Sequence, residues 1–154
     1  MTAPQPLLSL LAHAERERND AMSDAKRAEL EHRTAVRQSE QLLAYRSDYE
    51  QRWSRSFGDG GGIAIMHCYQ GFMQRLDAAI QTQQRVVALA AQRLADAQAL
   101  WQQREIRVAS VRKLAERRGE EARTVERRRE QKLQDEHAMR AAWLRSNGAA
   151  LAPL

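Results

Sequence analysis

Apolar side chains between residues 7 and 53 recur at alternating steps of four and three. This spacing is typical of a coiled-coil helix, in which the contact positions of each heptad are called a and d. Every d position is apolar, and the polar residues all fall at a. Many of the apolar positions are alanine, so a partner helix must supply larger apolar side chains to fill the interface. The positions are Leu7, Leu11, Ala14, Arg18, Ala21, Ala25, Ala28, His32, Ala35, Ser39, Leu42, Arg46, Tyr49 and Trp53.

A second and stronger heptad pattern begins at Met66. Up to Val111 only Gln83 and Arg104 are polar among its contact positions, and the same register then continues to Trp143 with more polar residues. A disordered chain has no reason to keep one register for so long, so we predict a helix over residues 63–145. The positions to Val111 are Met66, Tyr69, Met73, Leu76, Ile80, Gln83, Val87, Ala90, Leu94, Ala97, Trp101, Arg104, Val108 and Val111.

A glycine cluster separates the two patterns: four of the seven glycines lie between Gly58 and Gly62. Glycines end helices and reverse chains. A phosphate-binding loop would need Lys-Ser or Lys-Thr after the glycines and a strand before them, and neither is present. The sequence therefore predicts an all-α fold, a long antiparallel two-helix coiled-coil hairpin in a single domain over 1–154. The first helix would span about 7–57, the turn about 58–62, and the tail 146–154.

The predicted helices are unequal in length. Folding back at residue 60 places Leu7 beside about residue 113, so the second helix would continue without a partner. That overhang contains the basic run 'RTVERRREQK' and Gly119, which should weaken the helix locally by about 1 kcal/mol relative to alanine.

Composition and charge agree with this interpretation. The 154 residues are 29% charged and only 5% aromatic, too little for a large globular core. The net charge is +5, and all the excess lies beyond residue 57, which favours an acidic partner. Cys68 is the single cysteine, so a reducing compartment is expected. Neither a signal peptide nor a stretch of transmembrane length is recognisable.

The candidate chemistry is sparse. The four histidines are scattered, and none pairs with another at the spacing of a helical zinc site. We therefore predict no catalytic site, no metal site and no cofactor. We expect that the protein is not an enzyme. The basic run is accompanied by acidic residues and lacks interleaved aromatics, so a solvated helix is favoured over a nucleic-acid interface.

One flank of the predicted hairpin is more apolar than the other. In an antiparallel pair, g positions of both helices face the same side, and Tyr45, Phe72, Ala79 and Val86 all occupy g near the turn. The opposite flank, at e, is mostly polar. The g residues are therefore interpreted either as a protein-binding surface, with Tyr45 and Phe72 substantially exposed, or as a wider seam; both interpretations remain open.

Several motifs in order along the chain resemble the flagellar export protein FliJ family. They are 'YRSDYEQR' (45–52), the glycine linker, 'YQGFMQRLDAAIQTQ' (69–83), Trp101, 'LAERR' (114–118) and 'RRREQKLQDEHA' (127–138). The resemblance implies a coiled-coil stalk of the type III export machine, whose open end inserts into the export ATPase hexamer. It further implies a surface that binds the cytoplasmic part of the export gate membrane protein, and a role in escorting empty export chaperones.

The resemblance also implies which residues carry these contacts, and a location that is cytoplasmic and peripheral on the membrane at the flagellar base. Alternatives are the corresponding stalk of a virulence injectisome and a basic coiled coil that binds nucleic acid, although the tyrosine-rich and 'DE' motifs favour the flagellar assignment. Gln83 stands where the family pattern has histidine. The gate-binding residues would be Gln38, Leu42, Tyr45, Tyr49, Phe72, Leu76 and Ala79, and the ATPase-ring residues Leu7, Leu11, Arg118, Arg127, Arg128 and Arg129.

Overall fold

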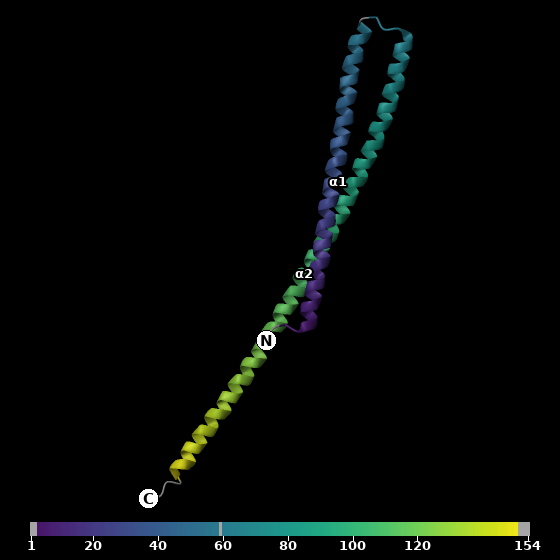
Figure 1. Ribbon diagram of the computed structural model, residues 1–154. Helices are drawn as coiled ribbons and strands as arrows, with labels where there is room; N and C mark the ends of the chain where they lie inside the picture. The colour runs from purple at the N-terminus through teal and green to yellow at the C-terminus, as the bar shows by residue number, and fades with distance from the viewer. Residues whose placement is uncertain (1–2, 59, 151–154) are drawn as a thin grey trace. The chain divides into compact units, whose positions relative to one another are not determined.

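The computed structural model describes residues 3–58 and 60–150. It contains two helices, α1 (Gln5–Gly58) and α2 (Ile63–Ala150), with no strand in the described ranges. Figure 1 shows the two helices joined at one end by the short segment after Gly58 and running antiparallel from it. The predicted fold class is confirmed: the chain is an all-α antiparallel hairpin whose second helix is the longer.

Contacts divide the chain into two compact units. The turn unit is Arg16–Glu105 and contains the turn with the helix segments that flank it. The terminal unit combines Met1–Glu15 with Ile106–Leu154, so the beginning of α1 packs there against the later part of α2. The two units are described separately below.

In the turn unit the predicted seam is the buried face of both helices. Four seam alanines of α1, at positions 21, 25, 28 and 35, are at most 8% exposed. Across from the α1 seam, α2 buries Met73, Leu76 and Ile80, against which Leu42, Tyr69 and Phe72 pack. The bulky part of the seam thus lies towards the turn, where Leu42 packs against α2, and the alanine-rich part lies further from the turn.

Polar residues of the seam find partners across it. Arg46 Nε donates to Asp77 Oδ1 of α2 at 2.6 Å, and its Nη1 donates to Glu50 Oε1 at 2.7 Å. The hydrogen bond with Asp77 raises the pKa of Arg46 above its ordinary value. Gln83 Nε2 donates to the carbonyl oxygen of Ala35 at 3.0 Å. A polar side chain at a contact position is tolerated because its donors are satisfied.

The same arrangement recurs at the other end of the turn unit. Arg104, the second polar contact residue of α2, donates from Nη1 to Glu17 Oε2 at 2.7 Å. Arg18 Nε lies 3.9 Å from Glu105 Oε1. These pairs link α1 to α2 through polar contact residues of the two heptad patterns.

The terminal unit begins with a proline-containing helix start. The carbonyl oxygen of Pro4 accepts hydrogen bonds from the amides of Leu7 and Leu8, and Pro6 lies in the first turn, where a helix needs no donor. Leu11 and Ala115 line a common groove, and Arg112 Nη2 donates to Glu15 Oε1 at 3.0 Å. The beginning of α1 therefore lies beside the part of α2 near residue 113, as predicted.

The surroundings of Gly119 differ from those predicted. It was expected in an unpartnered overhang, but it is buried, and a Cβ built on it would lie 3.8 Å from the backbone nitrogen of Ala3. The prediction was wrong because helix α1 begins at Gln5, before Leu7, and the residues ahead of it extend the contact.

Beyond residue 126, side chains of α2 are exposed throughout residues 127–146. The helix continues to Ala150, past the predicted end near residue 145. Asn147 and Gly148 are poor helix formers, but a single glycine costs only about 1 kcal/mol, and two alanines follow it. Residues 151–154 of the predicted tail lie outside the described part of the chain.

Two glycines of the turn have an identifiable role. Gly60 has a φ of +93°, a conformation that side chains strongly disfavour, and its amide donates to the carbonyl oxygen of Phe57 at 3.3 Å. A Cβ on Gly61 would lie 3.2 Å from the ring of Phe57. The carbonyl oxygen of Gly62 then accepts from Ile65 and Met66 as α2 begins.

Candidate functional site

Six of the eight aromatic residues of the chain gather beside the turn. Four come from α1 at successive steps of four residues, so they lie along one face of the helix. Two come from α2, opposite them. We call this group the aromatic cluster: Tyr45, Tyr49, Trp53, Phe57, Tyr69 and Phe72.

The rings of the aromatic cluster form an unbroken series of contacts. Tyr49 stacks on Phe72 with centroids 4.3 Å apart, and Tyr45 meets the edge of Phe72 at 6.3 Å. Nearer the turn, Trp53 and Phe57 both contact Tyr69, at 5.2 and 5.6 Å. Each aromatic pair contributes about 0.5–1.5 kcal/mol beyond its buried area. The cluster thus ties the two helices together where the alanine-rich part of the seam has ended.

The residues expected to bind the gate lie together on this part of the turn unit, although they differ in how much surface they offer. Gln38, Tyr45 and Ala79 are exposed. Leu42, Tyr49 and Phe72 are half-buried, and Leu76 is only 7% exposed because it belongs to the core of the seam. Leu76 can therefore support such a surface but offers little of it.

Substantial exposure was predicted for Tyr45 and Phe72, and the structure shows it only for Tyr45. Tyr45 is 48% exposed. Phe72 is half-buried, because Tyr49 stacks on its face and the ring also packs against the Met73–Leu76–Ile80 core. Phe72 thus widens the seam, whereas Tyr45 presents its ring to the outside.

Sequence reasoning did not single out Phe57 and did not group Trp53 and Tyr69 with the other rings. The signal was present in the steps of four residues from Tyr45 through Tyr49 and Trp53 to Phe57. The heptad register hides it, because these four residues occupy four different heptad positions: g, d, a and e.

The residues expected to meet the ATPase ring lie in the terminal unit. Leu7 and Leu11 are half-buried, and the four arginines at 118, 127, 128 and 129 are exposed on α2. Arg118 Nη1 lies 3.8 Å from Glu121 Oε2. Because both side chains are exposed, this ion pair contributes little to stability.

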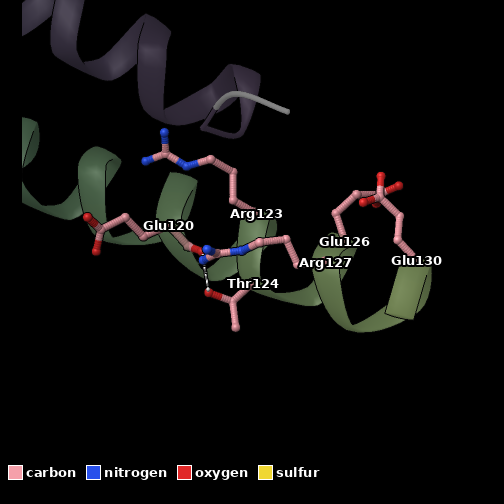
Figure 2. A pocket seen from close by; sticks show the side chains of 6 residues that line it. All are labelled: Glu120, Arg123, Thr124, Glu126, Arg127 and Glu130. Atoms are coloured by element: carbon pink, nitrogen blue, oxygen red, sulfur yellow. Dashed lines mark hydrogen bonds between the residues drawn. The ribbon is translucent and has the colours of Figure 1, made fainter. Parts of the chain in front are cut away.

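Figure 2 shows a shallow hollow on this part of α2. Its lining carries three carboxylates and two guanidinium groups, and Arg127 Nη2 donates to Thr124 Oγ1 at 3.4 Å. A surface of such mixed charge offers no concentrated field for an anion. The lining residues are Glu120, Arg123, Thr124, Glu126, Arg127 and Glu130.

No three His, Cys, Asp or Glu side chains in ranges 3–58 and 60–150 lie together as metal ligands would. Neither α1 nor α2, as described, contains a stretch that is apolar enough over sufficient length to cross a bilayer.

The paired helices and their seam define a two-helix coiled-coil protein with an aromatic cluster beside its turn. A family model described as "Flagellar FliJ protein" matches residues 3–147, nearly the whole chain. The chain belongs to the FliJ family and is a component of the flagellar type III protein export apparatus; the family is structural and is not known for enzymes. No curated protein and no solved structure matches the chain.

Proposed function

We propose that this chain is the stalk of the export apparatus, which couples the export ATPase hexamer to the export gate membrane protein. The terminal unit enters the ATPase ring, and the flank beside the turn binds the cytoplasmic part of the gate. The chain also escorts empty export chaperones, and it works in the cytoplasm at the membrane face of the flagellar base. The observation that carries the proposal is Tyr45, an exposed ring held in place by Phe72 and Tyr49.

The coupling needs mechanical properties rather than catalytic residues. Two helices linked by a buried seam and by cross-helix ion pairs resist bending more than a single helix does. A conformational change that nucleotide causes in the ATPase ring is therefore transmitted from the ring-binding residues to the gate-binding residues. Such a role requires a fit to the ring and a recognised surface at the gate, and no cofactor.

Gate binding is tested with the double variant Tyr45→Ala/Phe72→Ala. Covering an exposed aromatic ring is worth roughly 2 kcal/mol at about 25 cal/mol per Å², with a smaller share from Phe72 because it is already half-buried. We expect affinity for the cytoplasmic part of the gate to fall at least tenfold, since 1.4 kcal/mol is a factor of ten. Helix content should stay the same, because Met73 and Leu76 still fill the seam.

The outcome of this test is read from two measurements. Normal gate binding by the double variant, measured by titration calorimetry, would falsify the gate surface. Loss of the circular-dichroism signal would instead make the two rings structural. Stimulation of the ATPase should be unchanged, since the ring is proposed to contact other residues.

Ring binding is tested by ending the chain after Val111. This truncation removes Arg118 and Arg127–Arg129, and we expect it to abolish stimulation of the ATPase while gate binding persists. A full-length variant with alanine at positions 127, 128 and 129 should lower stimulation as well. Its matched control is Arg75→Ala/Arg85→Ala/Arg93→Ala, which removes three exposed arginines from the turn unit. Equal stimulation by all variants would refute ring insertion.

A further inference from the structure

The later part of α2 has an exposed apolar face that follows the heptad positions. Val125 and Met139 occupy d positions and are 52% and 73% exposed. Trp143 at a is 64% exposed, and Leu133 at the adjoining e position is 56% exposed. Single exposed leucines need no explanation, whereas an apolar row along one side of a helix is typical of an interaction surface. We call the a and d positions from Val125 to Trp143, together with Leu133, the overhang face.

The middle of the overhang face carries charge of both signs. Its remaining contact positions are Arg129, Lys132 and Glu136, and all three are exposed. A charged side chain that is covered without a partner is destabilising, so a helix lying on this face must offer a carboxylate to Lys132 and a positive group to Glu136. The partner therefore needs apolar residues at both ends of its contact face, with basic and acidic residues between them.

A second copy of the same helix meets these requirements when it runs antiparallel. In an antiparallel pair, the a positions of one helix lie opposite the d positions of the other. An alignment centred on Gln134 places Lys132 opposite Glu136 of the second copy, and twofold symmetry places Glu136 opposite Lys132 of that copy. The two central layers thus each contain one positive and one negative side chain.

The outer layers of the same alignment are apolar or amphipathic. Val125 lies opposite Trp143, which provides a wide apolar surface at each end of the pairing. Arg129 lies opposite Met139 and can place its aliphatic stem along the methionine while its guanidinium group reaches water. The layers from Val125 to Trp143 are therefore compatible with burial against a second copy.

The flanking positions are complementary as well. Along one flank Glu126 lies opposite Arg140, and Leu133 meets its own copy at the twofold axis. Along the other flank Asp135 lies near its own copy, and Arg128 and Lys132 of the second copy lie close enough to offset that repulsion. Opposite charges along the flanks of a coiled coil favour one partner and one orientation.

Other symmetric alignments are less complementary. In a parallel pair each contact residue meets its own copy, so Arg129, Lys132 and Glu136 would all oppose like charges. An antiparallel shift of one heptad leaves Glu136 opposite Val125 or Met139. Charge thus selects both the orientation and the alignment of the second copy.

We propose that a second copy of this chain covers the overhang face, pairing antiparallel through residues 125–143 with reciprocal contacts between Lys132 and Glu136. The interface is short and partly polar, so the dimer forms as protein concentration rises and dissociates on dilution. The dimer covers Arg129, one of the residues proposed above to meet the ATPase ring, and so holds the chain outside the ring. This last consequence rests on the proposed function, whereas the pairing itself does not.

The pairing is tested by sedimentation equilibrium of the full-length protein, from dilute to concentrated solution, where we expect a monomer–dimer equilibrium. Lys132→Glu and Glu136→Lys should each weaken the dimer by about tenfold or more, because each places like charges in both central layers. The double variant Lys132→Glu/Glu136→Lys should return the affinity to within about threefold of the parent, since the pairs are then reversed rather than lost. The matched control Arg127→Glu, at an exposed position on the outer side of the helix, should leave the dimer nearly unchanged.

The orientation is tested by cross-linking in a Cys68→Ser background, because Cys68 is exposed. Leu133→Cys should be joined to its copy by a reductant-cleavable bis-maleimide, since an antiparallel pair brings these two residues together at the twofold axis. The matched control Gln134→Cys lies on the outer side of the helix and should stay unlinked at the same protein concentration. The linked dimer should not stimulate the export ATPase, and cleavage of the linker should restore stimulation.

Failure of the pairing and failure of the proposed function give different results. A protein that stays monomeric at every concentration, or a dimer that charge reversal leaves unchanged, overturns the inference and leaves the proposed function intact. Stimulation by the linked dimer overturns its exclusion from the ring. Absence of stimulation by the parent protein and by the cleaved dimer contradicts the proposed function and not the pairing.

Two further measurements guard against effects on folding. If a charge variant loses helix content, Trp143→Gln must weaken the dimer instead, and an unchanged dimer overturns the inference. Hydrogen exchange of the amides at 125–143 should slow as the concentration of the parent protein rises, because dilute protein exposes the unpaired helix. Exchange that is independent of concentration there would also overturn the inference.

Discussion

The earlier and later parts of α2 carry one heptad register but differ in what surrounds them. Between residues 73 and 90 its contact residues Met73, Leu76, Ile80 and Ala90 are at most 8% exposed. At positions of the same register further along, Met139 is 73% exposed and Trp143 is 64% exposed. A heptad pattern thus specifies a face of a helix, whereas the length of the partner decides whether that face is buried.

Amide hydrogen exchange should show the largest difference between these parts. The amides of residues 73–104 should exchange only when the whole turn unit unfolds. For a typical domain stability of at least about 5 kcal/mol, this requirement slows their exchange by roughly a thousandfold or more. Amides at 127–146 belong to a helix whose side chains are all exposed and should exchange far faster. Equal protection, measured by mass spectrometry, would mean that a partner such as a second copy covers the later part.

Enlarging an alanine should separate the two parts by stability. Ala25 is 4% exposed in the seam, so Ala25→Leu should destabilise the protein by about 1–3 kcal/mol through overpacking. The melting temperature should fall by about 2–4 °C per kcal/mol. The control Ala142→Leu, at an exposed position of the later part, should leave it nearly unchanged. A rise in melting temperature for Ala25→Leu would show that the seam has spare room.

Substitutions of two glycines, Gly119 between the two parts of α2 and Gly60 in the turn, should have the smallest effect. Gly119→Ala should stabilise α2 by up to about 1 kcal/mol, since the added Cβ meets Ala3 at an ordinary contact distance. Gly60→Ala should destabilise by about 1–2 kcal/mol because of its positive φ. Thermal melts of the two variants that shift in the same direction would contradict this account.

Much of the fold follows from sequence because its determinants are local and periodic. Alternation of apolar residues fixed the seam, and the only dense group of glycines fixed the turn. The partners of Arg46 and Gln83 were not foreseen, since a long polar side chain can reach several acceptors once two helices are side by side. Gly119 was misplaced because its burial depends on a few residues that precede α1.

The candidate site was foreseen less completely. The register placed Tyr45 and Phe72 on one flank, but it treats all g positions alike and says nothing about ring stacking. Phe72 is less exposed than predicted because of a specific neighbour, Tyr49. The contribution of Phe57 depends on packing against Tyr69 close to the turn. Such contacts follow from three-dimensional proximity, which heptad lettering does not encode.

The arginines of the seam also solve a problem of translational symmetry. A row of alanines at successive heptads looks the same after a slip of one heptad, so it cannot by itself distinguish correct from shifted pairing. A slip would move Arg46 from Asp77 to Gln70 or Gln84, and Arg18 from Glu105 to Gln98 or Arg112. Arg46 and Arg18 lose their cross-helix carboxylates in either shifted alignment, and one alignment opposes Arg18 to Arg112. The polar residues thus make the alignment unique along a stretch where the apolar residues leave it degenerate.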